Sequence, residues 1–207
     1  MRKATKLATA AILTAALAFS LSACDGTKTP EAAYEPPPEA FPNYRERPEL
    51  PTGMEPVIVM LGKQNLTDSQ LRDMVARGEI PMDATVIGLG DNNLTDISVL
   101  REFKELRSVN ILGNDVEDIS VLAELPHLVA INVGGNKIKD ITPLANLEHL
   151  MELHIMNNEI SDISVLKTMN SLSYVNVFGN PITAAQINEV DDALTTTDVF
   201  PIRANRR

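Results

Sequence analysis

Residues 106–127 read LRSVNILGNDVEDISVLAELPH, and the same order of apolar and polar positions returns in residues 128–149 and 150–171. An asparagine recurs every 22 residues, at Asn92, Asn114, Asn136, Asn158 and Asn180. A fixed period of about 20 to 50 residues is typical of a solenoid, in which each unit buries its apolar face against its neighbours. The chain is therefore predicted to be one short coil copied several times.

The apolar positions within one copy predict the path of the chain. In residues 106–127 they are Leu106, Val109, Ile111, Val116, Ile119, Leu122 and Leu125. Apolar and polar residues alternate around Val109 and Ile111, which is the period of a half-buried strand, so successive copies are expected to stack into one parallel sheet. The second half of the copy is too short for an ordinary helix between turns and predicts a 3₁₀ turn.

Two polar columns accompany the apolar ones. The carboxamide of each recurring asparagine is expected to bond backbone groups of its own coil and of neighbouring coils, because those groups are costly to bury unpaired. Asp96, Asp118, Asp140 and Asp162 stand just before the second turn of each copy, where a carboxylate can accept from free backbone N–H groups. The alternative is a calcium ladder, but one carboxylate per coil lacks the dense oxygen cluster that calcium prefers.

Each end of the repeat array predicts a helix. Residues 58–68 match residues 86–96, but the coil that they open is six residues longer than the others. The extra length begins with the capping-box pattern TDSQ at residues 67–70, and TAAQ at residues 183–186 opens a similar segment at the other end. Such helices provide the caps that a solenoid needs. Residues 198–200 predict a last edge strand, because Pro201 would block further pairing.

The repeat as a whole can be written L-x-x-L-x-L-x-x-N-x-I-x-D-I-S-x-L-x-x-L-x-x. This pattern closely resembles the 22-residue leucine-rich repeat of the internalins, a class of bacterial surface proteins, and the resemblance extends from Val57 to about Ile202. It implies an α/β solenoid with a parallel sheet on the concave face, 3₁₀ turns on the convex face and helical caps at both ends. Adhesion or invasion is the role associated with that family.

The N-terminal residues resemble an export signal. A basic start containing Arg2, Lys3 and Lys6 precedes an apolar stretch over residues 7–21, which is too short for a confident membrane span. The stretch ends in Leu-Ser-Ala-Cys, similar to the lipobox of bacterial lipoproteins, in which the cysteine is lipidated. Cys24 is the lone cysteine of the chain and has no second cysteine to pair with. We therefore expect residues 1–23 to be removed and the protein to be anchored by lipid to the extracytoplasmic face of the cell membrane. An ordinary signal peptide with a chance cysteine is the alternative.

Composition predicts how the rest of the chain divides into a tether, the repeat domain and a tail. Residues 24–55 hold most of the prolines with interspersed glutamates, which predicts a disordered tether, or alternatively a Pro-rich ligand for a partner's groove. Residues 56–202 then form the repeat domain with its caps, and residues 203–207 a tail. Without residues 1–23 the chain keeps 15 basic and 28 acidic residues. Such an acidic surface argues against nucleic acid as a partner.

No catalytic or metal-binding motif is present. His127 and His149 are 22 residues apart, so periodicity explains them, and no Cys-His or paired-His metal spacing occurs. A serine in a glycine elbow and a phosphate-binding loop are also missing from the sequence. The sequence predicts no cofactor, no metal and no enzyme.

The candidate binding residues are those that point away from the core on the strands. They are Asn110, Leu112, Asn132, Glu152, His154, Met156, Tyr174, Asn176 and Phe178. Outward-facing aromatic residues and Met, gathered with Asn and His, predict a surface for a protein partner or a surface glycan. Burial of this cluster under the C-terminal cap or the tail is one alternative, and a structural or assembly role in the cell envelope is another. The protein is expected to be a monomer.

Overall fold

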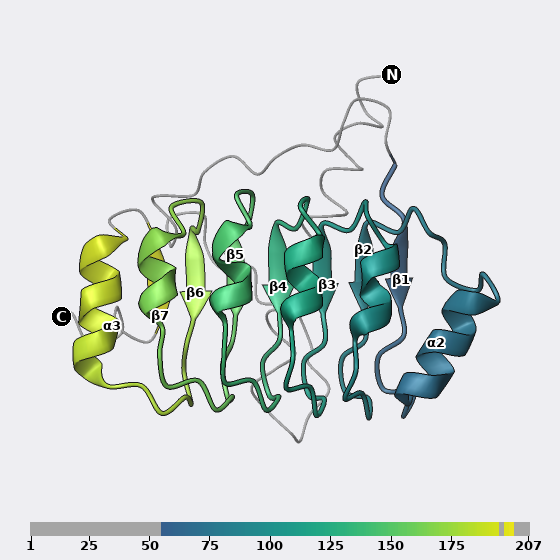
Figure 1. The fold of residues 1–207 in the computed structure, drawn as a ribbon, viewed down its shortest axis with the longest axis horizontal. Helices are drawn as coiled ribbons and strands as arrows, with labels where there is room; N and C mark the ends of the chain where they lie inside the picture. The colour runs from purple at the N-terminus through teal and green to yellow at the C-terminus, as the bar shows by residue number, and fades with distance from the viewer. Residues whose placement is uncertain (1–54, 195–196, 201–207) are drawn as a thin grey trace, which may run out of the picture.

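A computed structural model describes residues 55–194 and 197–200. Within them one parallel sheet runs through the molecule, with its strands in the order of the chain (Figure 1). The strands are β1 (Ile58–Met60), β2 (Val86–Gly88), β3 (Ser108–Asn110), β4 (Ala130–Asn132), β5 (Glu152–His154), β6 (Tyr174–Asn176) and β7 (Asp198–Phe200). The predicted solenoid is therefore confirmed, including the last edge strand at residues 198–200.

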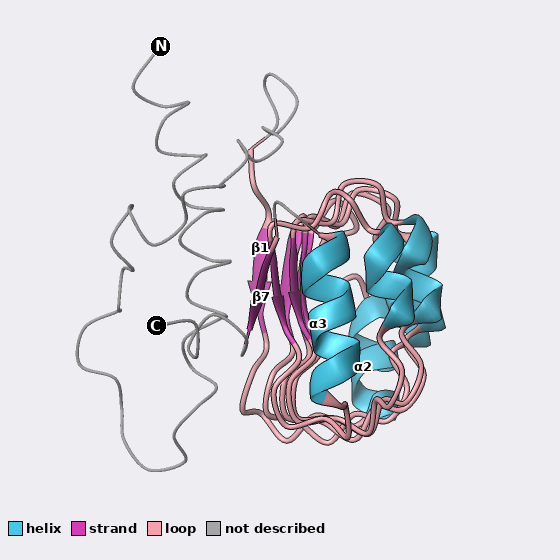
Figure 2. Ribbon diagram, turned by 90° about the vertical axis from the view of Figure 1, so that its left-hand side faces the viewer, coloured by secondary structure: helices cyan, strands magenta, loops and turns pink. Residues whose placement is uncertain are grey.

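A second layer of short helical turns covers one face of this sheet (Figure 2). It consists of four 3₁₀ turns, η2 (Ser98–Glu102), η3 (Ser120–Glu124), η4 (Thr142–Asn146) and η5 (Ser164–Thr168), between the end helices α2 (Asp68–Ala76) and α3 (Ala184–Ala193) among the described residues. The predicted 3₁₀ turns and helical caps are therefore both confirmed.

Each strand pairs with its neighbour in a register of one whole repeat. Val109 lies opposite Ile87 on one side and Ile131 on the other. The ladder continues beyond the three-residue strands, because Leu89 N donates to Asn110 O at 2.7 Å and Asp91 N donates to Leu112 O at the same distance. Every coil therefore presents the same position at the same height along the solenoid.

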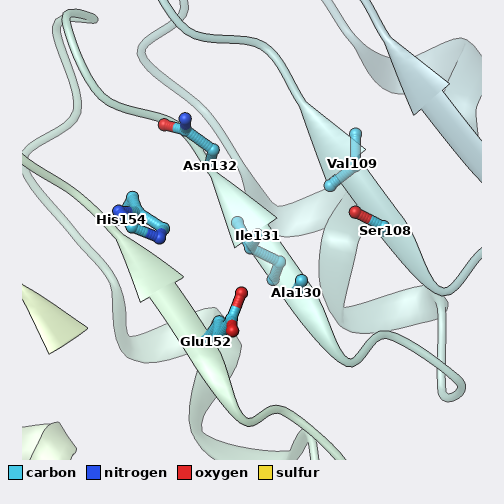
Figure 3. Close-up of a pocket in the computed structure, with 7 residues that line it drawn as sticks. All are labelled: Ser108, Val109, Ala130, Ile131, Asn132, Glu152 and His154. Atoms are coloured by element: carbon cyan, nitrogen blue, oxygen red, sulfur yellow. The ribbon is translucent and has the colours of Figure 1, made fainter. Parts of the chain in front are cut away.

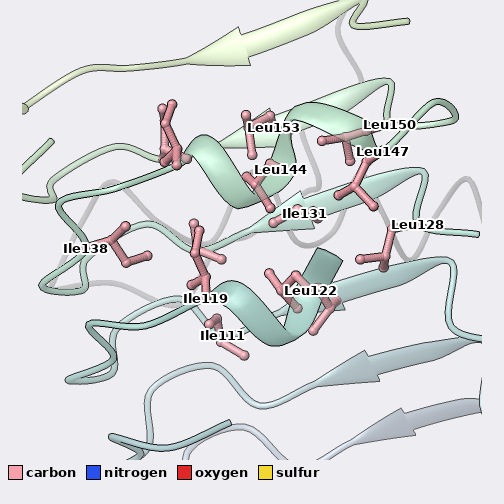
Figure 4. Packing of buried hydrophobic residues seen from close by; sticks show 14 of the residues in the cluster. Ile111, Ile119, Leu122, Leu128, Ile131, Ile138, Leu144, Leu147, Leu150 and Leu153 are labelled. Atoms are coloured by element: carbon pink, nitrogen blue, oxygen red, sulfur yellow. The ribbon is translucent and has the colours of Figure 1, made fainter. Parts of the chain in front are cut away.

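The core lies between the sheet and the 3₁₀ turns (Figure 4). Leucine, isoleucine and valine fill it in repeated layers; one layer contributes Leu128, Ile131, Val133, Ile138, Ile141, Leu144 and Leu147, all buried. Burying one such side chain fully stabilises the folded state by roughly 1.5 to 3 kcal/mol. Only thin layers of equal shape fit between coils, which is consistent with 4% aromatic residues in the chain.

The recurring asparagines join the coils through buried hydrogen bonds. Asn114 Oδ1 accepts from Leu94 N of the preceding coil at 3.0 Å. Its Nδ2 donates to Leu89 O of that coil and to Ile111 O of its own coil, at 3.1 and 2.9 Å. Corresponding bonds occur at Asn92, Asn136, Asn158 and Asn180. This column therefore links the backbone of each coil to that of the preceding one.

The aspartate column also has its predicted role. Asp118 Oδ1 accepts from Ser120 N at 2.8 Å at the start of η3, and Asp96, Asp140 and Asp162 make the equivalent bond in their own coils. The bonds from the backbone and hydroxyl of Ser120 hold the pKa of Asp118 below its ordinary value. These carboxylates therefore cap the 3₁₀ turns.

Both cap helices start with a closed capping box. In α2, Gln70 N donates to Thr67 Oγ1 and Thr67 N donates to Gln70 Oε1; Thr183 and Gln186 repeat the arrangement before α3. Asp68 then extends from α2 to the next coil, where it accepts from Thr95 N at 2.8 Å. The caps are thus tied to their neighbours by side chains as well as by apolar packing.

The predicted signal peptide, the lipidation site at Cys24, most of the tether, Pro201 and the tail lie outside the described residues. No helix within residues 55–194 and 197–200 has the length and apolar character needed to span a membrane.

Candidate binding face

The predicted binding residues lie on the face of the sheet that is turned away from the 3₁₀ turns. The central residue of each strand belongs to the core, as Val109 and Ile131 do. Because successive strand residues point to opposite sides, the residues before and after it face the other way. We call this side, which corresponds to the predicted concave face, the outer sheet face.

The structure places the nine candidates on one face but does not leave all of them open to solvent. Asn110, Asn132, His154 and Met156 are buried, with exposed fractions between 2% and 7%. Leu112, Glu152, Tyr174 and Asn176 are half-buried. Phe178 is 55% exposed. Asn110, Asn132, His154 and Met156 therefore lie on the predicted face, but little of their side chains is accessible to a partner.

The buried asparagines of this face bond to their own turn. Asn110 Oδ1 accepts from Leu112 N at 2.9 Å, and Asn132 Oδ1 accepts from Gly134 N at 3.1 Å. Asn176 makes the same bond to Phe178 N. A side-chain oxygen that accepts from the backbone two residues later closes an Asx turn. This second asparagine column was visible in the sequence, and the turn preference of asparagine is the signal that predicts its structural role.

Met156 is buried because glycine leaves room beside it. A Cβ atom placed on Gly134 would lie 3.1 Å from Leu112 Cδ1 on one side and 3.1 Å from Met156 Cγ on the other. The two side chains therefore converge over the glycine of the coil between them. Leu112 and Met156 both occupy the space above Gly134, which gives Met156 a packing role.

His154 takes the place of the second asparagine in β5. Its ring lies beside Tyr174, with the ring centroids 5.1 Å apart and the planes inclined by 41°. The buried Nδ1 atom has no hydrogen-bond partner among the described residues. Burial lowers the pKa of His154 to about 4, since desolvation penalises the charged imidazolium. The ring is therefore neutral near pH 7.

A small hollow opens between β3, β4 and β5 on this face (Figure 3). Its lining consists of Ser108, Val109, Ala130, Ile131, Asn132, Glu152 and His154. Ser108, Ala130 and Glu152 occupy the same register position in successive strands. Because Ala130 carries only a methyl group between its two neighbours, the hollow forms above it. Its volume of about 10 Å³ has room for one water-sized group.

Ion pairs join neighbouring coils along the surface. Lys137 Nζ lies 2.7 Å from Asp115, and similar pairs connect Arg72 with Asp96, Arg101 with Glu124, Lys139 with Glu159 and Lys167 with Glu189. All are exposed, so each contributes little stability, about 0 to 1 kcal/mol. These pairs do, however, bind basic side chains to acidic ones in a chain whose net charge is −10. The surface therefore remains acidic.

Among the described residues, this face offers an accessible apolar side chain and no cluster of metal ligands. No group of three or more His, Cys, Asp or Glu side chains in the described part of the chain is placed to hold a metal ion. The large apolar residues that are exposed within the same residues are Ile58, Met60, Met82 and Phe178. Phe178 lies two residues after the end of β6, and its N–H donates to Asn176 Oδ1 of that strand. It is therefore the most accessible apolar group at the C-terminal end of the outer sheet face.

Comparison with known proteins supports the repeat assignment. Residues 146–167 match the family described as Leucine Rich repeat. The solved structure of an internalin C2 from Listeria monocytogenes has 27% sequence identity and a TM-score of 0.50, over 61% of this chain and 54% of that chain. No curated protein matches the sequence.

Two further solved structures are similar. An internalin (inlF) from Listeria monocytogenes has 28% identity and a TM-score of 0.46, over 59% of this chain and 44% of that chain. A leucine-rich-repeat protein from Leptospira interrogans has 16% identity and a TM-score of 0.47, over 57% of this chain and 37% of that chain. The chain thus spans about half or less of these proteins. Its fold is that of a leucine-rich-repeat solenoid, and its repeats are internalin-like.

Proposed function

We propose that this protein is a binding module that captures a protein partner with the C-terminal end of its outer sheet face. The observation that carries this proposal is the 55% exposure of Phe178 on a face whose other candidates are buried or half-buried. Leucine-rich-repeat solenoids typically present such a face to proteins, and the repeat match and the internalin C2 similarity agree with that use.

The surroundings of Phe178 suit an anchor for a partner. Its backbone is fixed, because its N–H donates to Asn176 Oδ1 and its carbonyl accepts from Asn157 N at 2.7 Å. An aromatic side chain on a fixed backbone loses little conformational freedom on binding and buries a large apolar area. Tyr174 and Glu152, both half-buried, lie opposite each other at the start of β6 and β5 and add polar groups to the same face, as in the rim of protein interfaces.

The experiment is a photo-crosslinking capture with the full chain in its native membrane. A photoreactive phenylalanine analogue at position 178 identifies the partner, and capture of that partner is then compared between the wild-type chain and Phe178→Ala. We expect a loss of tenfold or more, as for an interface hot spot. Met82→Ala is the matched control, because Met82 is a similarly exposed apolar residue away from β6. Equal capture by wild type and Phe178→Ala would refute the proposal.

We further propose that Cys24 carries a lipid and that the binding domain lies on the extracytoplasmic face of the cell membrane. Support comes from the Leu-Ser-Ala-Cys sequence at residues 21–24 after an apolar stretch with a basic start. Replacement of Cys24 by Ser is expected to move the protein from the membrane fraction to the soluble fraction. If the variant stays with membranes after extraction of peripheral proteins, the anchor is not at this cysteine.

An assembly role is the second candidate, and the exposed residues of β1 favour it. Ile58 and Met60 are 39% and 49% exposed on a terminal strand of the sheet, and such strands can pair with another chain. Light scattering on the purified chain tests this role. A monomer at all concentrations contradicts it, whereas an oligomer that Met60→Lys dissolves supports it.

A further inference from the structure

The unassigned feature of the outer sheet face is the burial of its middle part. We propose that residues 34–44, which belong to the predicted tether and read YEPPPEAFPNY, dock on this face across β2, β3, β4 and β5. The contact lies within one chain. The inference therefore goes beyond the proposed capture of a partner and does not depend on it.

The first step is the burial of Val86, an outward-facing residue. Its neighbour Ile87 lies in the core, so Val86 points to the outer sheet face, yet it is completely buried. In the register of the sheet it lies between Ile58 and Ser108, and Gly88 follows it on the same face. Ile58 is itself exposed, and a serine and a glycine are too small to cover a valine.

The burial continues along the face, where Ser108, Asn110 and Asn132 are also buried. Figure 2 shows the described helices and 3₁₀ turns on the opposite side of the sheet, so none of these elements covers the outer sheet face. The residues are buried within a single chain. We therefore infer that another part of the same chain, outside the described residues, covers them.

The second step is reach. The described residues begin at Glu55, directly before β1 at one edge of the sheet. Neighbouring strands lie about 4.8 Å apart, so β5 is roughly 19 Å from β1. The ten residues 45–54 connect the proposed segment to Glu55, and an extended chain of that length covers roughly 31 Å. Residues 34–44 can therefore reach every strand from β2 to β5.

The C-terminal tail does not have this reach. It follows β7 at the other edge of the sheet, and β2 lies five strands away from β7, at roughly 24 Å. Residues 201–207 cover roughly 22 Å when fully extended, so the tail ends before it reaches Val86. Ile202 is also the only large apolar residue in the tail.

The third step is composition. Three of the eight aromatic residues of the chain lie in the segment, namely Tyr34, Phe41 and Tyr44. A disordered spacer typically contains few aromatic residues, whereas docked aromatic side chains bury a large apolar area. The prolines at positions 36–38 and 42 favour the extended polyproline II conformation, which is already low in entropy when it binds a groove. The segment therefore has the chemistry of a docked peptide.

The test is intramolecular photo-crosslinking of the full chain purified in detergent. A photoreactive phenylalanine analogue replaces Tyr44, and a control chain carries the same analogue in place of Thr27. Mass spectrometry then locates the attachment sites. We expect the analogue at position 44 to attach to the outer sheet face of β2 to β5. Phe41→Ala in the same chain should lower this yield by about tenfold, because it removes a buried apolar side chain without changing the repeat domain.

Chains labelled with heavy and light isotopes, mixed before irradiation, show whether each attachment lies within one chain. Heavy–light pairs would assign the cover to a second copy and overturn the inference. Three other results would also overturn it: attachment mainly to the 3₁₀ turns, the same attachment pattern from position 27, or a yield that Phe41→Ala leaves unchanged.

Discussion

Replacement of His154 by Asn is expected to remove a pH dependence from the stability of the fold. In the register of the sheet, position 154 lies between Asn132 and Asn176, and both of these close an Asx turn. Asn at position 154 can accept from Met156 N in the same way. The substitution thus replaces an imidazole whose buried Nδ1 has no hydrogen-bond partner among the described residues with the side chain that neighbouring coils already use.

The size of this pH dependence follows from the lowered pKa of His154. His154 has a pKa of about 4 in the folded chain, against an ordinary value of 6.5. Above pH 6.5 both states are neutral at this ring, and the ring adds no pH dependence. As the pH falls from 6.5 to 4, the unfolded chain takes up a proton that the folded chain refuses, so the free energy of unfolding falls by about 1.4 kcal/mol per pH unit. The total loss is about 3 kcal/mol, a large share of a typical stability of about 5 to 15 kcal/mol.

The assay is urea denaturation followed by circular dichroism at pH 7, 5.5 and 4.5. We expect the stability of His154→Asn relative to wild type to rise by about 2 to 3 kcal/mol between the first and last pH. The lowered pKa values of Asp118 and Asp162 affect both proteins equally and cancel in this difference. His149→Asn, at an exposed position, controls for the substitution itself. A difference that stays constant from pH 7 to 4.5 would refute the buried, neutral histidine.

Two further substitutions test the scaffold by the same denaturation assay at pH 7. Asn114→Ala leaves buried backbone groups of two coils unpaired and should lower the free energy of unfolding by about 3 kcal/mol or more. Asn180→Ala, at the half-buried end of the column, should lower it by less. Equal losses of stability in the two variants would contradict this prediction. Asn157 has a φ of 53°, a left-handed conformation that glycine adopts more readily than alanine. Asn157→Ala should therefore lose about 1 kcal/mol of stability, and Asn157→Gly should lose none. An alanine variant more stable than the glycine variant would show that backbone strain does not decide stability at this position.

The fold could be predicted from the sequence because every coil needs the same side chains at the same positions to pack against its neighbours. The position of Asn114 is surrounded by backbone groups of two coils that need a donor and an acceptor together, and asparagine meets both needs with one side chain. The same requirement recurs every 22 residues, so it is visible as a column. The caps were predictable for a similar reason, since Thr67 and Gln70 make purely local bonds.

The burial of the outer sheet face could not be predicted in the same way. Alternation shows which side of the sheet a residue occupies, but it does not show how its neighbours fill the space beside it. Met156 is buried over Gly134, and this depends on the side chain of the adjacent coil. The sequence did contain one relevant signal at Asn110, whose short side chain favours a bond to its own turn. Cys24 as a lipidation site stays a prediction.

The two asparagine columns differ in what they connect, and this difference indicates where binding specificity can vary. Asn114 joins two coils, so its replacement weakens the stack itself. Within the described residues, Asn110 bonds the backbone two residues ahead in its own coil, so asparagine at this position contributes a local bond and does not join two coils. The chain varies this position: the same register position holds Gly88 and His154. At His154 the departure from asparagine places beside a hollow a buried nitrogen that has no hydrogen-bond partner among the described residues, one strand away from the β6 segment that leads to Phe178. The column that the fold constrains least is therefore the one where the outer sheet face acquires distinct chemistry.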